Sequence, residues 1–205
     1  MTHHVGSVDP RSRCVKLTRK TLMMSCASVA LAATALIPQS AQAQSLGAFR
    51  GSITGSTGSV TRSPLTNTTE TTTIGSSTAT INWSPTSQQQ GGGPIDFLPN
   101  GNTATFTSAQ GVTDYTVLNR ILPTSGQAIS LNGHVVSTLQ GTSATGGKVW
   151  FYSPNGIVIG ASAVFDVGSL LLTTNDVTSF STSATGFNAT FAATSGSTSK
   201  IQIQN

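Results

Sequence analysis

Histidine, cysteine, serine and carboxylate side chains are the groups in this sequence that could do covalent or acid–base chemistry. Residues 44–205 contain one histidine, His134, and no cysteine. A Ser-His-Asp triad could be assembled with Asp114, Asp166 or Asp176, but no Gly-x-Ser-x-Gly elbow lies on a strand–helix turn to present the nucleophile. We therefore interpret His134 as a residue of a strand or sheet edge rather than as a catalytic base.

The acidic residues are too scattered for carboxylate chemistry. Glycoside hydrolysis needs two carboxylates beside the scissile bond, and a calcium site needs several oxygen ligands together. The acidic residues of this part of the chain are Glu70, Asp96, Asp114, Asp166 and Asp176. Asp166 alternates with apolar neighbours and is expected to face solvent, whereas Asp176 is expected to close a turn. The sequence therefore predicts no enzyme, metal or cofactor, and we expect Trp83 and Trp150 to be core residues rather than carbohydrate platforms.

Residues 1–43 have the pattern of a secretory signal peptide. An uncharged run covers residues 22–37, and Ala41 and Ala43 form an A-x-A cleavage site that places the mature start at Gln44. The run is preceded by the basic residues Arg11, Arg13, Lys16, Arg19 and Lys20. A transmembrane anchor is the alternative, but the run is shorter than the roughly 20 residues that a bilayer core requires. We therefore expect export through the Sec translocon and cleavage.

Removal of the leader changes what the composition implies. The whole chain carries a net charge of +4, but residues 44–205 contain equal numbers of basic and acidic residues. A folded domain with no net charge gives no support for binding nucleic acid, which needs a basic patch. Both cysteines, Cys14 and Cys26, lie in the leader, so the mature domain has no disulfide.

The remaining sequence predicts an all-β domain. Residues 44–205 show no sustained 3.6-residue apolar period, whereas short β-branched and aromatic runs recur between turn-forming residues. In residues 148–174, apolar runs are separated by the Pro154-Asn155-Gly156 turn and by small residues. An Asn-Gly pair fits a two-residue hairpin, but runs with corners every few residues also fit one coil of a β-solenoid. A second Pro-Asn-Gly turn at residues 99–101 favours a recurring coil geometry.

Three motifs in order resemble the N-terminal domain of filamentous haemagglutinins, which is the secretion domain of two-partner secretion exoproteins. Residues 152–160 (YSPNGIVIG) and 163–174 (AVFDVGSLLLTT) are similar to the family's Asn-Pro-Asn-Gly-Ile segment, with Ser153 in place of the first Asn. A serine hydroxyl can still accept a backbone hydrogen bond across the turn. Residues 119–121 (NRI), with 129–133 (ISLNG) after them, resemble the family's Asn-Arg-Val element and its following strand. Residues 81–83 (INW) resemble its Ile-x-Trp strand.

The resemblance implies a fold and a function. The implied fold is a right-handed parallel β-helix with an N-terminal cap and short extra strands, expected to span residues 44–205 and to be followed by a missing repetitive passenger. The implied function is to target a surface or secreted adhesin to a cognate outer-membrane barrel transporter, with host-cell or matrix ligands bound by the passenger. The family's functional positions correspond to Asn119, Arg120, Ser153, Pro154, Asn155, Gly156 and Ile157. A self-contained adhesin or matrix protein and a carbohydrate-active β-helix enzyme are the alternatives.

Overall fold

The computed structural model describes residues 47–86, 92–142, 144–183, 186–192 and 197–205. These residues belong to one compact unit, Gln44–Asn205. All regular elements among them are β-strands, which confirms the predicted all-β class, and no membrane-spanning helix is found in them. The expected signal peptide and its cleavage residues, Ala41, Ala43 and Gln44, lie outside the described residues.

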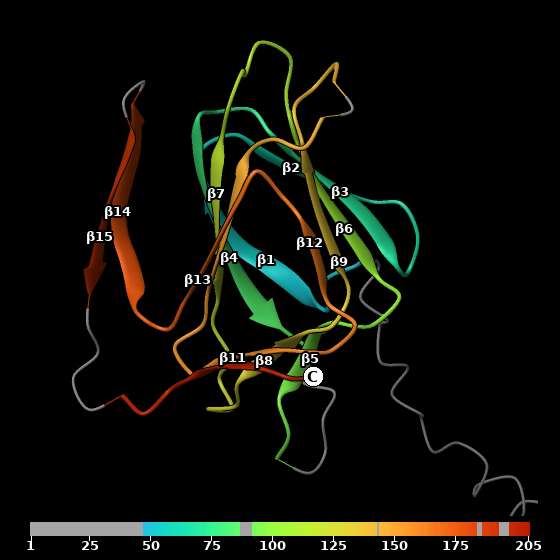
Figure 1. Ribbon diagram of the computed structural model, residues 1–205, viewed down its shortest axis with the longest axis vertical. Coiled ribbons are helices and arrows are strands. Elements are labelled where there is room, and N and C mark those ends of the chain that lie inside the picture. Colours follow the sequence, from blue (N-terminus) through green and yellow to red (C-terminus); the bar gives the residue numbers. More distant parts are fainter. Residues whose placement is uncertain (1–46, 87–91, 143, 184–185, 193–196) are drawn as a thin grey trace, which may run out of the picture. The chain divides into compact units, whose positions relative to one another are not determined.

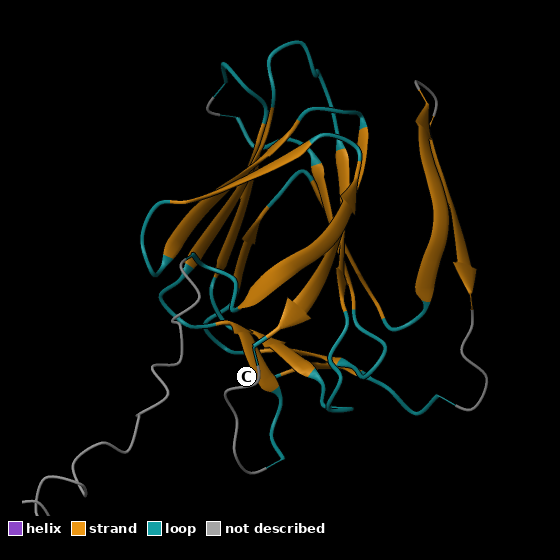
Figure 2. Ribbon diagram, turned by 180° about the vertical axis from the view of Figure 1, so that it is seen from behind, coloured by secondary structure: helices purple, strands orange, loops and turns teal. Residues whose placement is uncertain are grey.

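The described strands form three mainly parallel sheets and one hairpin (Figures 1 and 2). Sheet A contains β1 (Gly51–Thr57), β4 (Thr78–Pro85), β7 (Thr116–Ile121), β10 (Lys148–Tyr152) and β13 (Ser169–Thr173). Sheet B contains β2 (Val60–Pro64), β3 (Thr69–Ile74), β6 (Thr103–Ser108), β9 (His134–Thr138) and β12 (Val164–Asp166). Sheet C contains β5 (Ile95–Leu98), β8 (Ile129–Leu131), β11 (Ile157–Ile159) and β16 (Ile201–Ile203). The antiparallel hairpin consists of β14 (Asp176–Ser183) and β15 (Gly186–Ala192).

The chain visits the sheets in a fixed order. From β3 onward it passes through B, A and C in turn, and the hairpin interrupts this order only between β13 and β16. Each strand from β3 to β11 pairs in parallel with the strand three positions further along that order. We call three consecutive strands a coil. This arrangement is compatible with a parallel β-helix.

The parallel pairing decides between the two interpretations of the Asn155-Gly156 turn. β10 lies in sheet A and β11 in sheet C, so the turn is a corner between sheets and the hairpin alternative is wrong. The run at residues 163–173 is likewise two strands, β12 and β13, which Gly168 separates. The turn at residues 99–101 joins sheets C and B instead. The two Pro-Asn-Gly turns therefore occupy different corners and are not copies of one repeat.

Strand periodicity builds the core. β3, β4 and β6 alternate between buried and half-buried residues, and Ala79, Ile81 and Trp83, which alternate with polar residues in the sequence, all face inward. The centre of the core is aromatic: Phe49 packs with its ring centroid 4.9 Å from Phe97 and 5.2 Å from Trp83. Offset and tilted aromatic pairs of this kind add to the stabilisation that burial gives.

An ion pair fixes the N-terminal strands over this core. Glu70 is buried, and its Oε2 accepts hydrogen bonds from the Phe49 backbone N–H at 3.2 Å and from Arg62 Nη2 at 2.6 Å. Arg62 also donates to the carbonyl oxygens of Phe49 and Gly51, both at 3.1 Å, and its guanidinium lies 4.9 Å from the Trp83 ring centroid. β1 and β2 run antiparallel to β4 and β3, so they close the first edges of sheets A and B.

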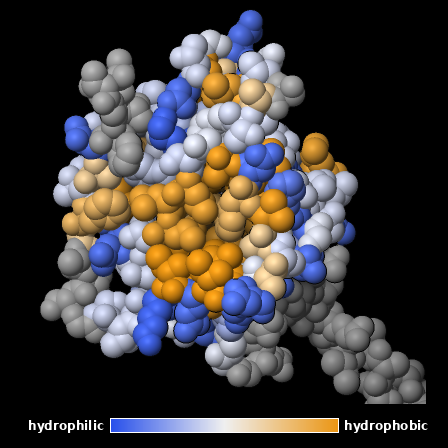
Figure 3. Space-filling model, in the orientation of Figure 1, coloured by the Kyte–Doolittle hydropathy of each residue, from blue (hydrophilic) through white to orange (hydrophobic). Residues whose placement is uncertain are grey.

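The opposite ends of the sheets are open. No described strand pairs with the outer edge of β12, β13 or β16. Leu170 and Ile201 lie beside the buried residues Val149 and Ile157, yet they are 37% and 42% exposed. Figure 3 shows apolar side chains gathered on the face that these strands border. On this side the core therefore ends in an apolar surface that no described strand covers.

Candidate functional site

Parts of the three motifs behind the family resemblance are neighbours in sheet A. Residues 81–83 lie on β4, residues 119–121 lie on β7, and the third motif begins at Tyr152, the last residue of β10; these strands pair in parallel. One row across these strands is Ile81, Asn119 and Phe151, and the next row is Asn82, Arg120 and Tyr152. Ser153 follows the second row directly. Segments that lie far apart in the sequence thus become neighbours at one end of the sheet.

Asn119 points into the core. Its side chain is fully buried, with Oδ1 accepting a hydrogen bond from Trp83 Nε1 at 3.1 Å and Nδ2 donating to the Trp150 carbonyl oxygen at 3.2 Å. A buried amide needs partners for both of its polar atoms. Asn119 finds them on the coil before and the coil after, so it ties three coils together.

Arg120 points to the other face of the sheet. Its Nε donates to Asp176 Oδ1 at 3.1 Å, and its Nη2 forms an ion pair with Asp176 Oδ2. Its Nη1 donates to Asn82 Oδ1 at 3.4 Å, and the guanidinium lies 5.8 Å from the Tyr152 ring centroid. Burial and the nearby Asp176 carboxylate both raise the pKa of Tyr152. Asp176 was expected to close a turn; it follows a bend at residues 174–175, begins β14, and holds the hairpin to sheet A through Arg120.

The corner after β10 is closed by backbone rather than by the Ser153 side chain. The Ser153 carbonyl oxygen accepts the Gly156 N–H at 3.3 Å, and the Ser153 N–H donates to Thr173. The Ser153 hydroxyl is buried and has no hydrogen-bond partner among the described residues. The serine therefore does not reproduce the side-chain bond that was expected to replace the one from asparagine.

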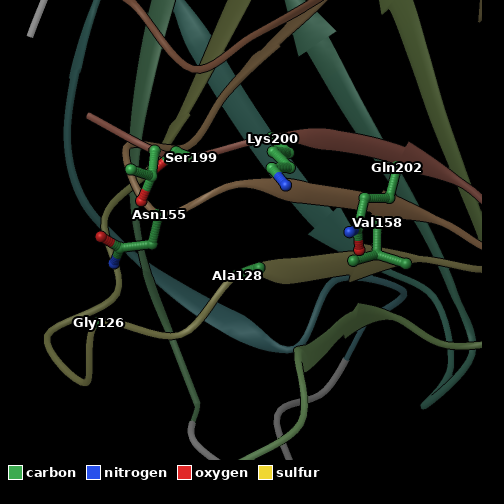
Figure 4. Close-up of a pocket in the computed structure, with 8 residues that line it drawn as sticks. Gly126, Ala128, Asn155, Val158, Ser199, Lys200 and Gln202 are labelled. Carbon is green, nitrogen blue, oxygen red and sulfur yellow. The ribbon is translucent and has the colours of Figure 1, made fainter. Parts of the chain in front are cut away.

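The next residues of the corner lie between neighbouring coils (Figure 4). Asn155 Nδ2 donates to the Pro123 carbonyl oxygen at 3.4 Å, whereas the Pro154 carbonyl oxygen accepts from Ser199 Oγ at 2.5 Å. Of the described corner residues 153–157, only Gly156 takes the left-handed conformation, with φ of 109°. Ile157 is buried, and its N–H donates to the carbonyl oxygen of Lys200 at 3.0 Å. The corner is thus a stacking joint, that is, a turn whose residues bond to the coil before and to the segment after it. It lies beside a surface groove that Asn155 helps to line.

The carboxylates and the histidine that were considered for catalysis do not lie together in one site. Asp96 accepts hydrogen bonds from Ser130 and Asn132, Asp114 pairs with Lys148, and Asp166 is exposed and accepts from Thr145. His134 is half-buried on β9. Within the described ranges, no three His, Cys, Asp or Glu residues lie close enough to hold a metal ion. Trp83 and Trp150 are both buried, as predicted for core residues.

The sequence reasoning missed the hairpin and its attachment. Leu118, Trp150 and Tyr152 on the outer face of sheet A form a second apolar cluster with Val177, and Phe180 packs against it. The Trp150 and Phe180 ring centroids are 5.3 Å apart. A signal was present in Trp150 and Tyr152, because two aromatic residues at alternate positions of a strand need a cover on that face.

No protein-family model matches the sequence, and no curated protein matches it. The resemblance to the haemagglutinin secretion domains therefore rests on the motifs and their order alone. Membership of that family, and the function that it implies, are proposals.

Proposed function

We propose that this chain is the secretion domain of a two-partner exoprotein and that its sheets form a right-handed parallel β-helix. The observation that carries the proposal is that residues 81–83 and 119–121 stack in register on β4 and β7, and that the third motif begins at Tyr152, beside Arg120, at the end of β10. Three segments that lie far apart in the sequence thus meet at one end of sheet A, on three successive coils.

The burial of these motifs favours recognition of the chain before it folds. Asn119, Ser153 and Ile157 are buried in the folded domain, so a partner cannot reach their side chains there. After Sec export, the unfolded chain would present them to the soluble domains of an outer-membrane barrel transporter. Extended segments rich in β-branched residues pair readily with an exposed sheet edge. The same residues then act a second time, as joints between coils, once the chain has crossed the outer membrane.

The open strand edges fit this order of events. β12, β13 and β16 can each accept a further parallel strand, whereas β1 and β2 close the other ends of sheets A and B. In repetitive folds, each unit is stabilised mainly by its neighbours, so a folded first set of coils lowers the cost of adding the next. The domain would thus nucleate a β-helical passenger at the cell surface.

The test is release of the full chain from a Gram-negative host, with and without a candidate barrel transporter. The variant is Asn155→Ala, which removes one long hydrogen bond and leaves Gly156 intact. The matched control is Asn100→Ala in the other Pro-Asn-Gly turn. We expect release to require the barrel and to fall for Asn155→Ala only. Equal release with and without the barrel would refute the proposal and leave the adhesin alternative.

A further inference from the structure

A second site lies between the outer face of sheet A and the hairpin. A groove of about 350 Å³ separates β14 from the end of β1 and from β4. Figures 1 and 2 show the hairpin beside sheet A, with β14 closer to the sheet than β15. This volume is at the lower end of the range for small-molecule sites. The groove therefore fits a ligand of about one or two rings.

The floor of the groove is hydroxyl-rich and incompletely paired. It is formed by Thr57, Thr78, Thr80 and Asn82. Asn82 Oδ1 accepts from Arg120, whereas its Nδ2 and the hydroxyl of Thr80 have no partner among the described residues. Amide and hydroxyl groups that converge on one groove can fix the orientation of a ligand that carries hydroxyl groups.

The apolar wall and the balanced charge of the groove restrict the chemical class of ligand that it can bind. Val177 and Phe180 of β14 line its apolar side, and packing against Trp150 holds the Phe180 ring in place. Arg120 reaches the groove, but its charge is balanced by Asp176. A phosphate or carboxylate ligand would need an unbalanced cation. A neutral ligand with polar groups on its edge and an apolar ring face fits both sides of the groove.

We propose that this groove binds a neutral saccharide of one or two pyranose rings. The ring face lies against Phe180, and the sugar hydroxyls bond to Asn82 Nδ2 and to the threonine hydroxyls of β4. The proposal does not depend on the secretion function, because it concerns the folded protein alone. It gives the domain a direct means of adhesion.

The test is saturation-transfer NMR on the purified protein with glucose, galactose, mannose and N-acetylglucosamine as separate probes. For at least one of these sugars we expect a dissociation constant on the order of 1 mM, as is usual for so small a ligand. Thr80→Val removes one hydroxyl at nearly constant volume and should weaken binding about fivefold. Phe180→Leu keeps the apolar packing, removes the ring and should weaken binding as well.

The control is Thr105→Val, which makes the same change on the half-buried outer face of sheet B, away from the groove. Circular dichroism and urea unfolding establish that each variant folds. The proposal is overturned if none of the four sugars shows transfer to the wild-type protein. It is also overturned if Thr105→Val weakens binding as much as Thr80→Val does.

Discussion

Substitution of Gly156 by alanine tests whether the corner is a stacking joint. Gly156 has φ of 109°, and an added Cβ would lie 2.9 Å from the Lys200 carbonyl oxygen and 3.4 Å from Ala128 Cβ. A left-handed conformation costs a non-glycine residue about 1–2 kcal/mol. Overpacking against a backbone atom that cannot rotate away costs about 1–3 kcal/mol more. Gly156→Ala should therefore lower the free energy of unfolding by about 2–5 kcal/mol.

Gly101 of the other Pro-Asn-Gly turn is the matched control. Its φ of 80° is also left-handed, but apart from its chain neighbours no described residue has a heavy atom within 4 Å of an added Cβ. Gly101→Ala should cost only about 1 kcal/mol, because the conformational penalty is partly offset by the lower entropy of the unfolded chain. Urea unfolding followed by tryptophan fluorescence measures both values, since Trp83 and Trp150 are buried. Equal losses for the two variants would refute the stacking role of the corner.

Two further predictions concern buried polar groups. Glu70→Gln should lower stability by about 3–5 kcal/mol in the same urea assay, because Arg62 would keep its charge in a mostly buried place without a carboxylate; a loss below about 1 kcal/mol would contradict this. Burial raises the pKa of Tyr115 above its ordinary value of 10.0. The folded protein should therefore lose stability as the pH rises above about 10, where only the unfolded chain ionises readily. Tyr115→Phe should weaken this pH dependence, and an unchanged slope would count against the assignment.

Local patterns in the sequence predicted the strands well. The alternation of Ala79, Ile81 and Trp83 identified the inward face of β4, because a strand places every second side chain on one side. Gly168 is one of the small residues between the apolar runs of residues 148–174, and it lies between β12 and β13. Such features depend on neighbours in the chain and can therefore be recognised without knowledge of the fold.

Long-range pairing could not be predicted in the same way. Asn155-Gly156 fits both a hairpin and a corner, and only the partners of β10 and β11 decide between them. Asp176 has the local sequence of a turn residue, but its role depends on Arg120, which is far away in the sequence. The hairpin was missed because its strands are rich in serine, threonine and alanine and have few apolar residues to give a period.

The position of Phe49 makes the order of folding differ from the order of synthesis. Its ring packs against Phe97, Phe106 and Phe151, which belong to three successive coils. The segment that contains Phe49 precedes all of them, yet its complete binding site exists only when β10 is in place. Contacts between residues so far apart in the chain form slowly, because a long loop must close first. Phe49, the first residue of the aromatic core in the sequence, is therefore fully packed only after the third coil has folded.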